Sequence, residues 1–191
     1  MKNRDSIIAI LVLMAIGAFA RLIPHMPNFT PTEGLAIFGA AYFAKKYWAV
    51  LATVVMLYFS DLLINNTIAR SFFTEQEGFI WFSPYMFFNL IAVVLTVIVT
   101  SNLLKKISVV SVFGSVLLSS VLFFLVSNFG AWAEGTIPYT KDFSGLMAAY
   151  AAGVPFYYPS LISTLLFTTI LFGSFEIFKL LISKRQKTVQ A

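Results

Sequence analysis

The feature that most constrains this 191-residue chain is the placement of its basic residues in clusters between long apolar runs. The clusters are Lys2/Arg4, Lys45/Lys46, Lys105/Lys106 and Lys184/Arg185/Lys187. Because cytoplasmic loops collect Lys and Arg, each cluster marks which end of the neighbouring apolar segments lies inside. With 59% hydrophobic and 11% charged residues, the chain has too little polar surface to coat a soluble globule. The pattern predicts one integral membrane domain over residues 1–191 with both termini in the cytoplasm.

Five apolar stretches are long enough to span a hydrocarbon core of about 30 Å. They cover residues 6–22, 47–64, 84–104, 107–126 and 156–183. Two shorter segments are assigned by counting membrane crossings. If residues 31–44 did not cross, Lys45/Lys46 and Lys105/Lys106 would both lie outside the cell. If residues 143–153 did cross, the basic carboxyl tail would lie outside. We therefore expect an all-α membrane protein with six transmembrane helices, of which the second is short. Residues 143–153 are expected to form an interfacial or re-entrant helix on the outer side.

The amino terminus permits a rival interpretation. Lys2 and Arg4, the apolar run that follows them and the sequence Ala18-Phe19-Ala20 imitate a cleavable signal peptide. The apolar run continues past Arg21 through Leu22 and Ile23, which favours a retained first span. Both interpretations place the rest of the chain in a membrane, and a multi-pass protein of the bacterial cytoplasmic (inner) membrane is the expectation.

Enzyme chemistry finds little support in the residues. Cysteine is absent, so disulfides, thiolate metal sites and a Cys nucleophile are excluded. One histidine, His25, excludes multi-histidine metal sites, and neither a G-x-S-x-G elbow nor a phosphate-binding G-x-x-x-x-G-K loop occurs. We expect no enzyme, no metal and no cofactor. The net charge of +5 follows from topology, so no nucleic-acid partner is expected.

Polar residues gather at the outer ends of the predicted spans. At about 1.5 Å per residue, Arg21 and Asp61 fall at one depth, which predicts an ion pair that faces the bundle interior. This pair could staple helices or bind a ligand. Of the acidic residues, only Asp5 and Glu176 lie toward the inside. The asymmetry indicates a site open to the outside without a complete polar pathway through the membrane.

The connection after the first span sharpens this hypothesis. Three prolines and Gly34 prevent helix over residues 24–34, and the span that follows is short, so the loop is expected to dip in and form one wall of a pocket. An exposed turn with locally thinned bilayer is the alternative. Trp132 and Tyr139, expected in a loop with Pro138, could stack on a ligand, whereas the other aromatic residues form an interfacial belt. The candidate substrate-binding residues are Arg21, His25, Asn28, Phe29, Glu33, Asp61, Asn89, Asn128, Trp132 and Tyr139.

Four segments resemble a family of small bacterial membrane proteins: residues 21–31, 39–43, 60–61 and 127–132. That family is similar to the substrate-binding S components of energy-coupling-factor vitamin transporters, including solitary cobalamin-uptake members. The resemblance implies six helices, an outward pocket capped by loops, a vitamin ligand, and a partner module of a membrane scaffold subunit and two ATPases.

Two departures qualify the resemblance. Some cobalamin carriers hold cobalt through a cysteine, which this chain lacks, so His25 or Met26 would replace it, or the cobalt is not bound directly. The small-residue stripe that S components use for docking lies in their first helix, and here Ala36, Ala40 and Ala44 place it in the second.

The sequence therefore predicts a membrane protein of S-component type that binds a vitamin-sized solute, with cobalamin or a related corrinoid as first candidate, and mediates its uptake. A non-transporting structural or accessory subunit is the alternative. An intramembrane enzyme that uses Arg21, Asp61 and His25 is a third hypothesis.

Overall fold

The computed structural model describes residues 3–23, 25–73, 76–135 and 138–190, and its regular elements in these ranges are all helical. The α-helices are α1 (Asn3–Ala20), α2 (Thr32–Tyr42), α3 (Lys46–Asn66), α4 (Pro84–Leu103), α5 (Val109–Glu134) and α6 (Phe143–Gln190), and a short 3₁₀ helix, η1 (Arg70–Phe72), follows α3. Four of them, α3 to α6, contain segments long and apolar enough to cross a membrane. The expected all-α membrane protein is confirmed at this level.

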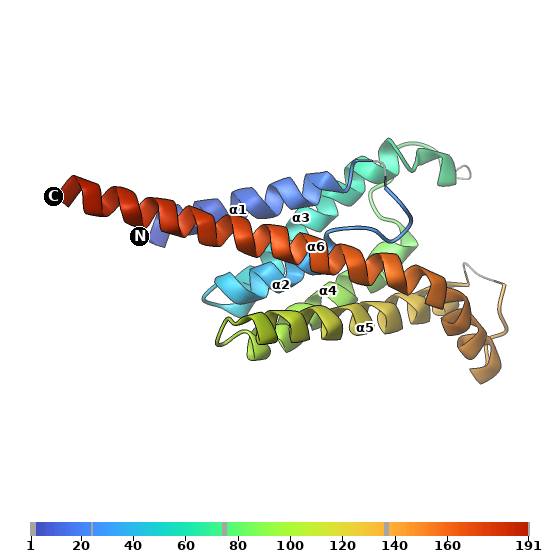
Figure 1. Cartoon of the computed structure of the whole chain (residues 1–191). Coiled ribbons are helices and arrows are strands. Elements are labelled where there is room, and N and C mark those ends of the chain that lie inside the picture. Colours follow the sequence, from blue (N-terminus) through green and yellow to red (C-terminus); the bar gives the residue numbers. More distant parts are fainter. Residues whose placement is uncertain (1–2, 24, 74–75, 136–137, 191) are drawn as a thin grey trace.

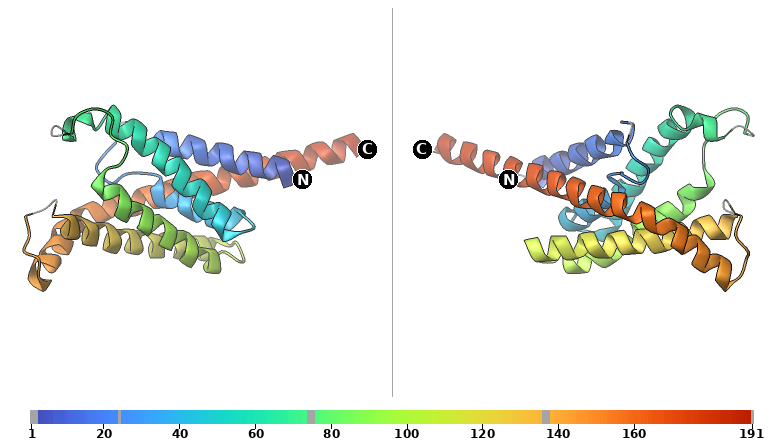
Figure 2. Two further views of the ribbon diagram at one scale, coloured as in Figure 1. Left: turned by 180° about the vertical axis from the view of Figure 1, so that it is seen from behind. Right: turned by 45° about the vertical axis from the view of Figure 1, so that its right-hand side comes forward.

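Helix α2 is the centre of the bundle. The other five α-helices contact one another in the cyclic order α1, α3, α4, α5, α6 and back to α1, and α2 contacts each of them. Figures 1 and 2 show the resulting arrangement, with α1 and α3 on one side, α4 and α5 on the other, and α6 running along the bundle. All residues of α2 from Thr32 to Ala40 are buried. Because α2 is enclosed by protein, its 11 residues need not match the thickness of a bilayer.

Aromatic residues fix α2 against α6. The Phe38 ring lies edge-on to Phe172 and Phe175 at centroid distances of 5.7 and 5.8 Å, and Tyr42 lies 4.4 Å from Phe175. The Tyr42 hydroxyl donates a hydrogen bond of 2.8 Å to Glu176. Edge-to-face pairs of this kind add about 0.5–1.5 kcal/mol to the free energy gained by burial. Packing of aromatic rings therefore holds the second half of α2 against α6.

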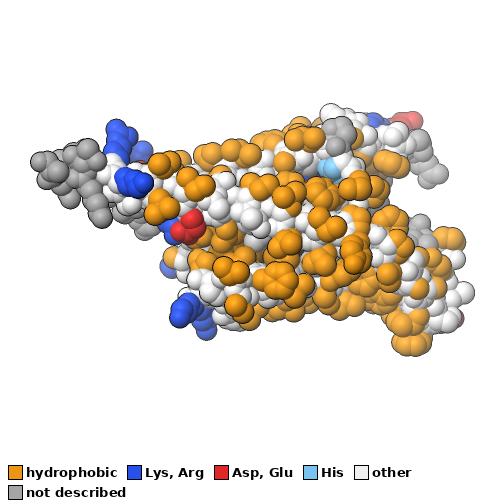
Figure 3. All heavy atoms as spheres, viewed as in Figure 1, with side chains coloured by type: hydrophobic (Ala, Val, Ile, Leu, Met, Phe, Trp, Pro, Cys, Tyr) orange, Lys and Arg blue, Asp and Glu red, His pale blue; other side chains and the backbone are white. Residues whose placement is uncertain are grey.

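The two ends of the bundle differ in charge. Both termini and the short connections before α3 and α5 lie at one end, which we call the basic end because most Lys and Arg side chains in view gather there (Figures 1 and 3). The longer connections, of which residues 21–23, 25–31, 67–73, 76–83 and 138–142 are described, lie at the opposite end, the loop end. Hydrophobic side chains cover most of the face between the ends (Figure 3). This arrangement is the one that the basic clusters predict.

Helix α5 is longer than its apolar run. It begins at a capping box, in which the Ser108 and Ser111 side chains each accept a hydrogen bond from the other residue's backbone N–H. It ends at Gly135, which adopts the left-handed conformation with a φ of 76°. Nothing between Val126 and Glu134 breaks a helix, so α5 continues past the predicted end of its span. Trp132, expected in a loop, therefore lies on a helix, and that prediction is wrong.

Helix α6 joins two segments that the sequence predicts as separate helices. It runs without a break over 48 residues, through Pro155 and Pro159, and Figure 1 shows that its first turns lie at an angle to the rest. Each proline removes one backbone hydrogen bond and bends the helix instead of ending it. Asp142 accepts hydrogen bonds from the Gly145 N–H and the Ser144 hydroxyl at the start of the helix, and they lower the pKa of its carboxyl. The separate outer helix over residues 143–153 is a wrong prediction.

Gly130 sets the spacing of α4 and α5. A Cβ atom added at Gly130 would overlap the Phe88 ring of α4, whereas one added at Gly114 on the same helix would meet nothing within 4 Å. We expect Gly130→Ala to lower the free energy of unfolding by about 1–3 kcal/mol, because the ring or the helix must move. Gly114→Ala is the matched control and should be neutral or slightly stabilising. Unfolding in mixed detergent micelles measures both, and equal stability of the two variants would contradict the close packing.

Candidate functional site

A polar cavity lies between the loop that precedes α2 and helices α4, α5 and α6. Its volume is about 340 Å³. The lining residues are Asn28, Phe88, Asn89, Phe123, Ser127, Asn128, Gly130, Ala131, Glu134 and Phe156. The cavity thus takes one wall from the loop and the others from three helices. In a protein whose surface between its ends is largely hydrocarbon, this concentration of amides and a carboxylate distinguishes the cavity from ordinary packing defects.

Three of the predicted site residues, Asn28, Asn89 and Asn128, meet at this cavity although they come from three different segments. Asn28 has a φ of 59°, and asparagine adopts this left-handed conformation more readily than most residues. The Asn128 amide donates 2.8 Å to the carbonyl of Phe124 one turn earlier. Its oxygen packs against Gly153 of α6, where an added Cβ would overlap it. Asn128 is therefore fixed in place, whereas Asn28 and Asn89 present accessible amides.

The floor of the cavity leads to a buried carboxyl group. A small hollow of about 10 Å³ shares Asn28, Ser127 and Asn128 with the cavity and also touches Ser160 of α6. The Ser160 hydroxyl donates a hydrogen bond of 2.7 Å to Glu33, which is 1% exposed in the first turn of α2. A hollow of this size holds about one water molecule. Glu33 thus lies behind the cavity wall, where it supports Ser160.

Arg21 and Asp61 form the predicted ion pair, at 2.6 Å. Arg21 follows α1 directly, and its guanidinium also donates 2.6 Å to the Ser60 hydroxyl of α3. The two side chains are only 13% and 14% exposed, so their charges compensate each other in a poorly solvated position. The cavity lining does not include either residue. The pair joins the end of α1 to α3, which favours the stapling role that the sequence left open.

The remaining predicted site residues lie outside the cavity lining. His25 is exposed, and its ring bonds the Met26 carbonyl at 2.9 Å; Phe29 lies edge-on to Phe167 of α6 at 6.1 Å. The Trp132 indole N–H donates 2.9 Å to the Thr140 carbonyl. Tyr139 is half-buried in the same connection. The structure thus brings three of the ten candidates together, and it places Trp132 as a brace for the loop after α5.

Sequence reasoning missed Glu134 and the three phenylalanines of the cavity wall. Phe123, Ser127, Gly130, Ala131 and Glu134 recur at the three- and four-residue spacing of one helix face. That signal was hidden because the fifth span was expected to end at residue 126. Had the helix been extended to Gly135, the same periodicity would have placed Glu134 on the same face as Ser127, two turns further along. Among the described residues, no cluster of three or more His, Cys, Asp or Glu could hold a metal ion.

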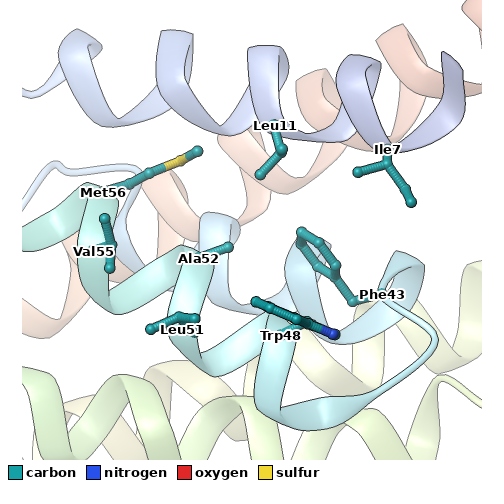
Figure 4. A pocket seen from close by; sticks show the side chains of 8 residues that line it. All are labelled: Ile7, Leu11, Phe43, Trp48, Leu51, Ala52, Val55 and Met56. Atoms are coloured by element: carbon teal, nitrogen blue, oxygen red, sulfur yellow. The ribbon is translucent and has the colours of Figure 1, made fainter. Parts of the chain in front are cut away.

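A larger hollow, of about 610 Å³, lies between α1 and α3 (Figure 4). Its lining is apolar apart from the indole nitrogen of Trp48: Ile7, Leu11, Phe43, Trp48, Leu51, Ala52, Val55 and Met56. Figure 4 shows Ile7 and Leu11 on α1 opposite the side chains of α3, with Phe43 at the end of α2 closing one side. Without amides or charges the hollow offers a water-soluble ligand nothing to orient it, and it is suited to hydrocarbon. The amide-lined cavity is the candidate site.

The structural role of the Arg21–Asp61 pair can be measured. We expect Arg21→Met and Asp61→Leu each to lower the free energy of unfolding by about 3–5 kcal/mol, because each leaves the partner's charge buried and unpaired. The double variant Arg21→Met/Asp61→Leu should lose less than either single change. Lys179→Gln is the control, because its pair with Glu176 is 37% and 47% exposed and is worth about 1 kcal/mol or less. Additive losses in the double variant would exclude a coupled pair.

Comparison with known proteins gives one family match. No curated protein sequence and no solved structure matches the chain. The model of a family described as "Family of unknown function (DUF6580)" matches residues 1–187. Since that match covers far more than half of the chain and all the residues that line the cavity, the protein belongs to the DUF6580 family.

Proposed function

We propose that this protein is a solute-binding membrane protein of S-component type, which captures a vitamin-sized solute in the amide-lined cavity and mediates its uptake. The observation that carries the proposal is the convergence of Asn28, Asn89 and Asn128 at one cavity near the loop end. A few amides in a wall that also contains three phenylalanines are typical of small-molecule sites. A wall that comes from a loop also gives a means of entry without opening the bundle.

The proposed membrane topology has six spans with both termini inside the bacterial cytoplasmic membrane. The gathering of basic residues at one end supports it, because Lys and Arg are retained in the cytoplasm. In this topology the cavity faces outward. The side of the bundle toward the basic end has an apolar core formed by residues such as Phe38, Phe172 and Phe175, so delivery inward requires movement of the whole bundle or an energising partner. An energy-coupling-factor module of a scaffold subunit and two ATPases is the proposed partner.

The size of the cavity bears on the solute. A volume of about 340 Å³ lies near the lower end of the roughly 300–1,000 Å³ of small-molecule sites. A corrinoid, the first candidate from the resemblance, fits only if the loop that carries Asn28 moves outward. A compact solute fits the cavity as it stands. Corrinoids therefore belong in a panel of vitamins to be tested, beside smaller members.

The alternative is an accessory subunit that transports nothing. The Arg21–Asp61 pair and the Trp132–Thr140 bond favour it, since both are structural contacts made by residues that a ligand site would use. The two functions differ in whether the cavity is ever filled.

Ligand binding is tested by replacing one accessible amide. We expect Asn89→Ala to lose a solute that co-purifies with the detergent-solubilised protein, detected by mass spectrometry. Its affinity should fall at least about tenfold, because a hydrogen-bonding partner of the solute is removed. Asn102→Ala on the same helix α4 is the control: Asn102 is exposed and accepts a hydrogen bond from Lys46, away from the cavity. An empty protein that no vitamin in the panel stabilises would establish the accessory subunit.

The topology can be mapped by cysteine labelling, since the chain has no cysteine of its own. Met26→Cys and Gln76→Cys at the loop end should react with a membrane-impermeant maleimide in intact cells. Lys45→Cys and Lys106→Cys at the basic end should react only after the membrane is permeabilised. All four positions are exposed, so reactivity reports the side of the membrane. Labelling of Lys45→Cys in intact cells would refute six spans with the termini inside.

A further inference from the structure

We infer that the cavity selects a compact organic cation, with a protonated amine or quaternary nitrogen placed at Glu134 and an apolar or aromatic body against the phenylalanine wall. The inference rests on the proposed function and names its class of ligand. Glu134 is the one ionisable residue among the described residues that line the cavity. One of its carboxylate oxygens, Oε2, is buried and has no hydrogen-bond partner. A buried acceptor of this kind is costly unless a ligand or water completes it.

The basic side chains near the site are already engaged. Lys141 donates to the backbone carbonyls of Trp132 and Ala133, with the Ala133 bond at 3.1 Å, and its ammonium lies 5.4 Å from the centre of the Trp132 ring. Arg21 is paired with Asp61. Within the described part of the chain, Glu134 has no ion pair. The positive charge that would complement it therefore has to arrive with the ligand.

The rest of the cavity wall suits the same chemistry. The faces of phenyl rings attract cations, and Phe88, Phe123 and Phe156 all line the cavity. The amide oxygens of Asn28 and Asn89 can accept from N–H groups of the ligand. An anion would meet the Glu134 carboxylate, which repels it.

Three probes of similar size separate charge from shape: phenethylammonium, 2-phenylethanol and phenylacetate. We expect the purified protein in lipid nanodiscs to bind phenethylammonium at least about tenfold more tightly than 2-phenylethanol, as one charge-assisted hydrogen bond provides. Phenylacetate should bind most weakly. Isothermal titration calorimetry measures all three affinities.

The variants assign the preference to Glu134. Glu134→Gln, which keeps the shape, should abolish the preference for the cation, and Glu134→Asp should retain it at lower affinity. Glu77→Gln is the matched control, because Glu77 is an exposed carboxylate outside the cavity and its loss should leave the preference unchanged.

Two results would overturn the inference: equal binding of the alcohol and the cation, or a cation preference that survives in Glu134→Gln. If Asn89→Ala still weakens all three probes in either case, solute binding stands and only the ligand class is wrong. If no probe binds at millimolar concentration, the cation inference is also refuted. The proposed function is then decided separately by whether a solute co-purifies with the unmodified protein.

Discussion

The enclosure of α2 by the other five α-helices is the constraint on which the rest of this structure depends. A backbone in hydrocarbon must satisfy its own hydrogen bonds, so irregular chain is tolerated at membrane depth only where protein covers it. The five helices around α2 provide that cover. This cover permits a helix of 11 residues with a carboxyl group in its first turn. Neither would be stable on a helix that faces lipid.

The polar groups of the protein fall into two arrangements that differ in what they leave unsatisfied. Arg21, Asp61 and Ser60 bond to one another, and Glu33 bonds to Ser160; of these side chains only the Arg21 Nε is buried without a partner, and it lies outside the cavity lining. Such contacts fix helices and leave little for a ligand. Around the cavity the opposite holds, since Asn28 and Asn89 are accessible and one oxygen of Glu134 has no partner. A ligand-binding site is more readily assigned to polar groups that remain unpaired than to groups that are already bonded to one another.

Much of the fold followed from charge and hydropathy, because these patterns report on the solvent around each segment. The segment over residues 31–44, which parity assigned to a short span, contains the helix α2 (Thr32–Tyr42), and the Arg21–Asp61 pair was found by equal depth. The predictions that failed concerned where a helix ends and whether two helical segments are continuous. The fifth span was expected to end at residue 126, yet α5 continues to Glu134, and residues 143–153 and 156–183 were predicted as separate helices, yet α6 contains both. Of the site, the three asparagines could be anticipated, but the order of helices around α2 is set by packing, which periodicity does not encode.

The cavity has walls of unequal rigidity, and this has a consequence for how the family can diversify. Three walls belong to helices whose spacing depends on close contacts such as Gly130 with Phe88 and Gly153 with Asn128, so a change there disturbs the bundle itself. The fourth wall is the loop that carries Asn28, which packs against no such glycine. Under the proposed function, variation in that loop can alter which solute binds at little cost to the scaffold. Members of the family can therefore share one helical bundle and, under the proposed function, bind different solutes.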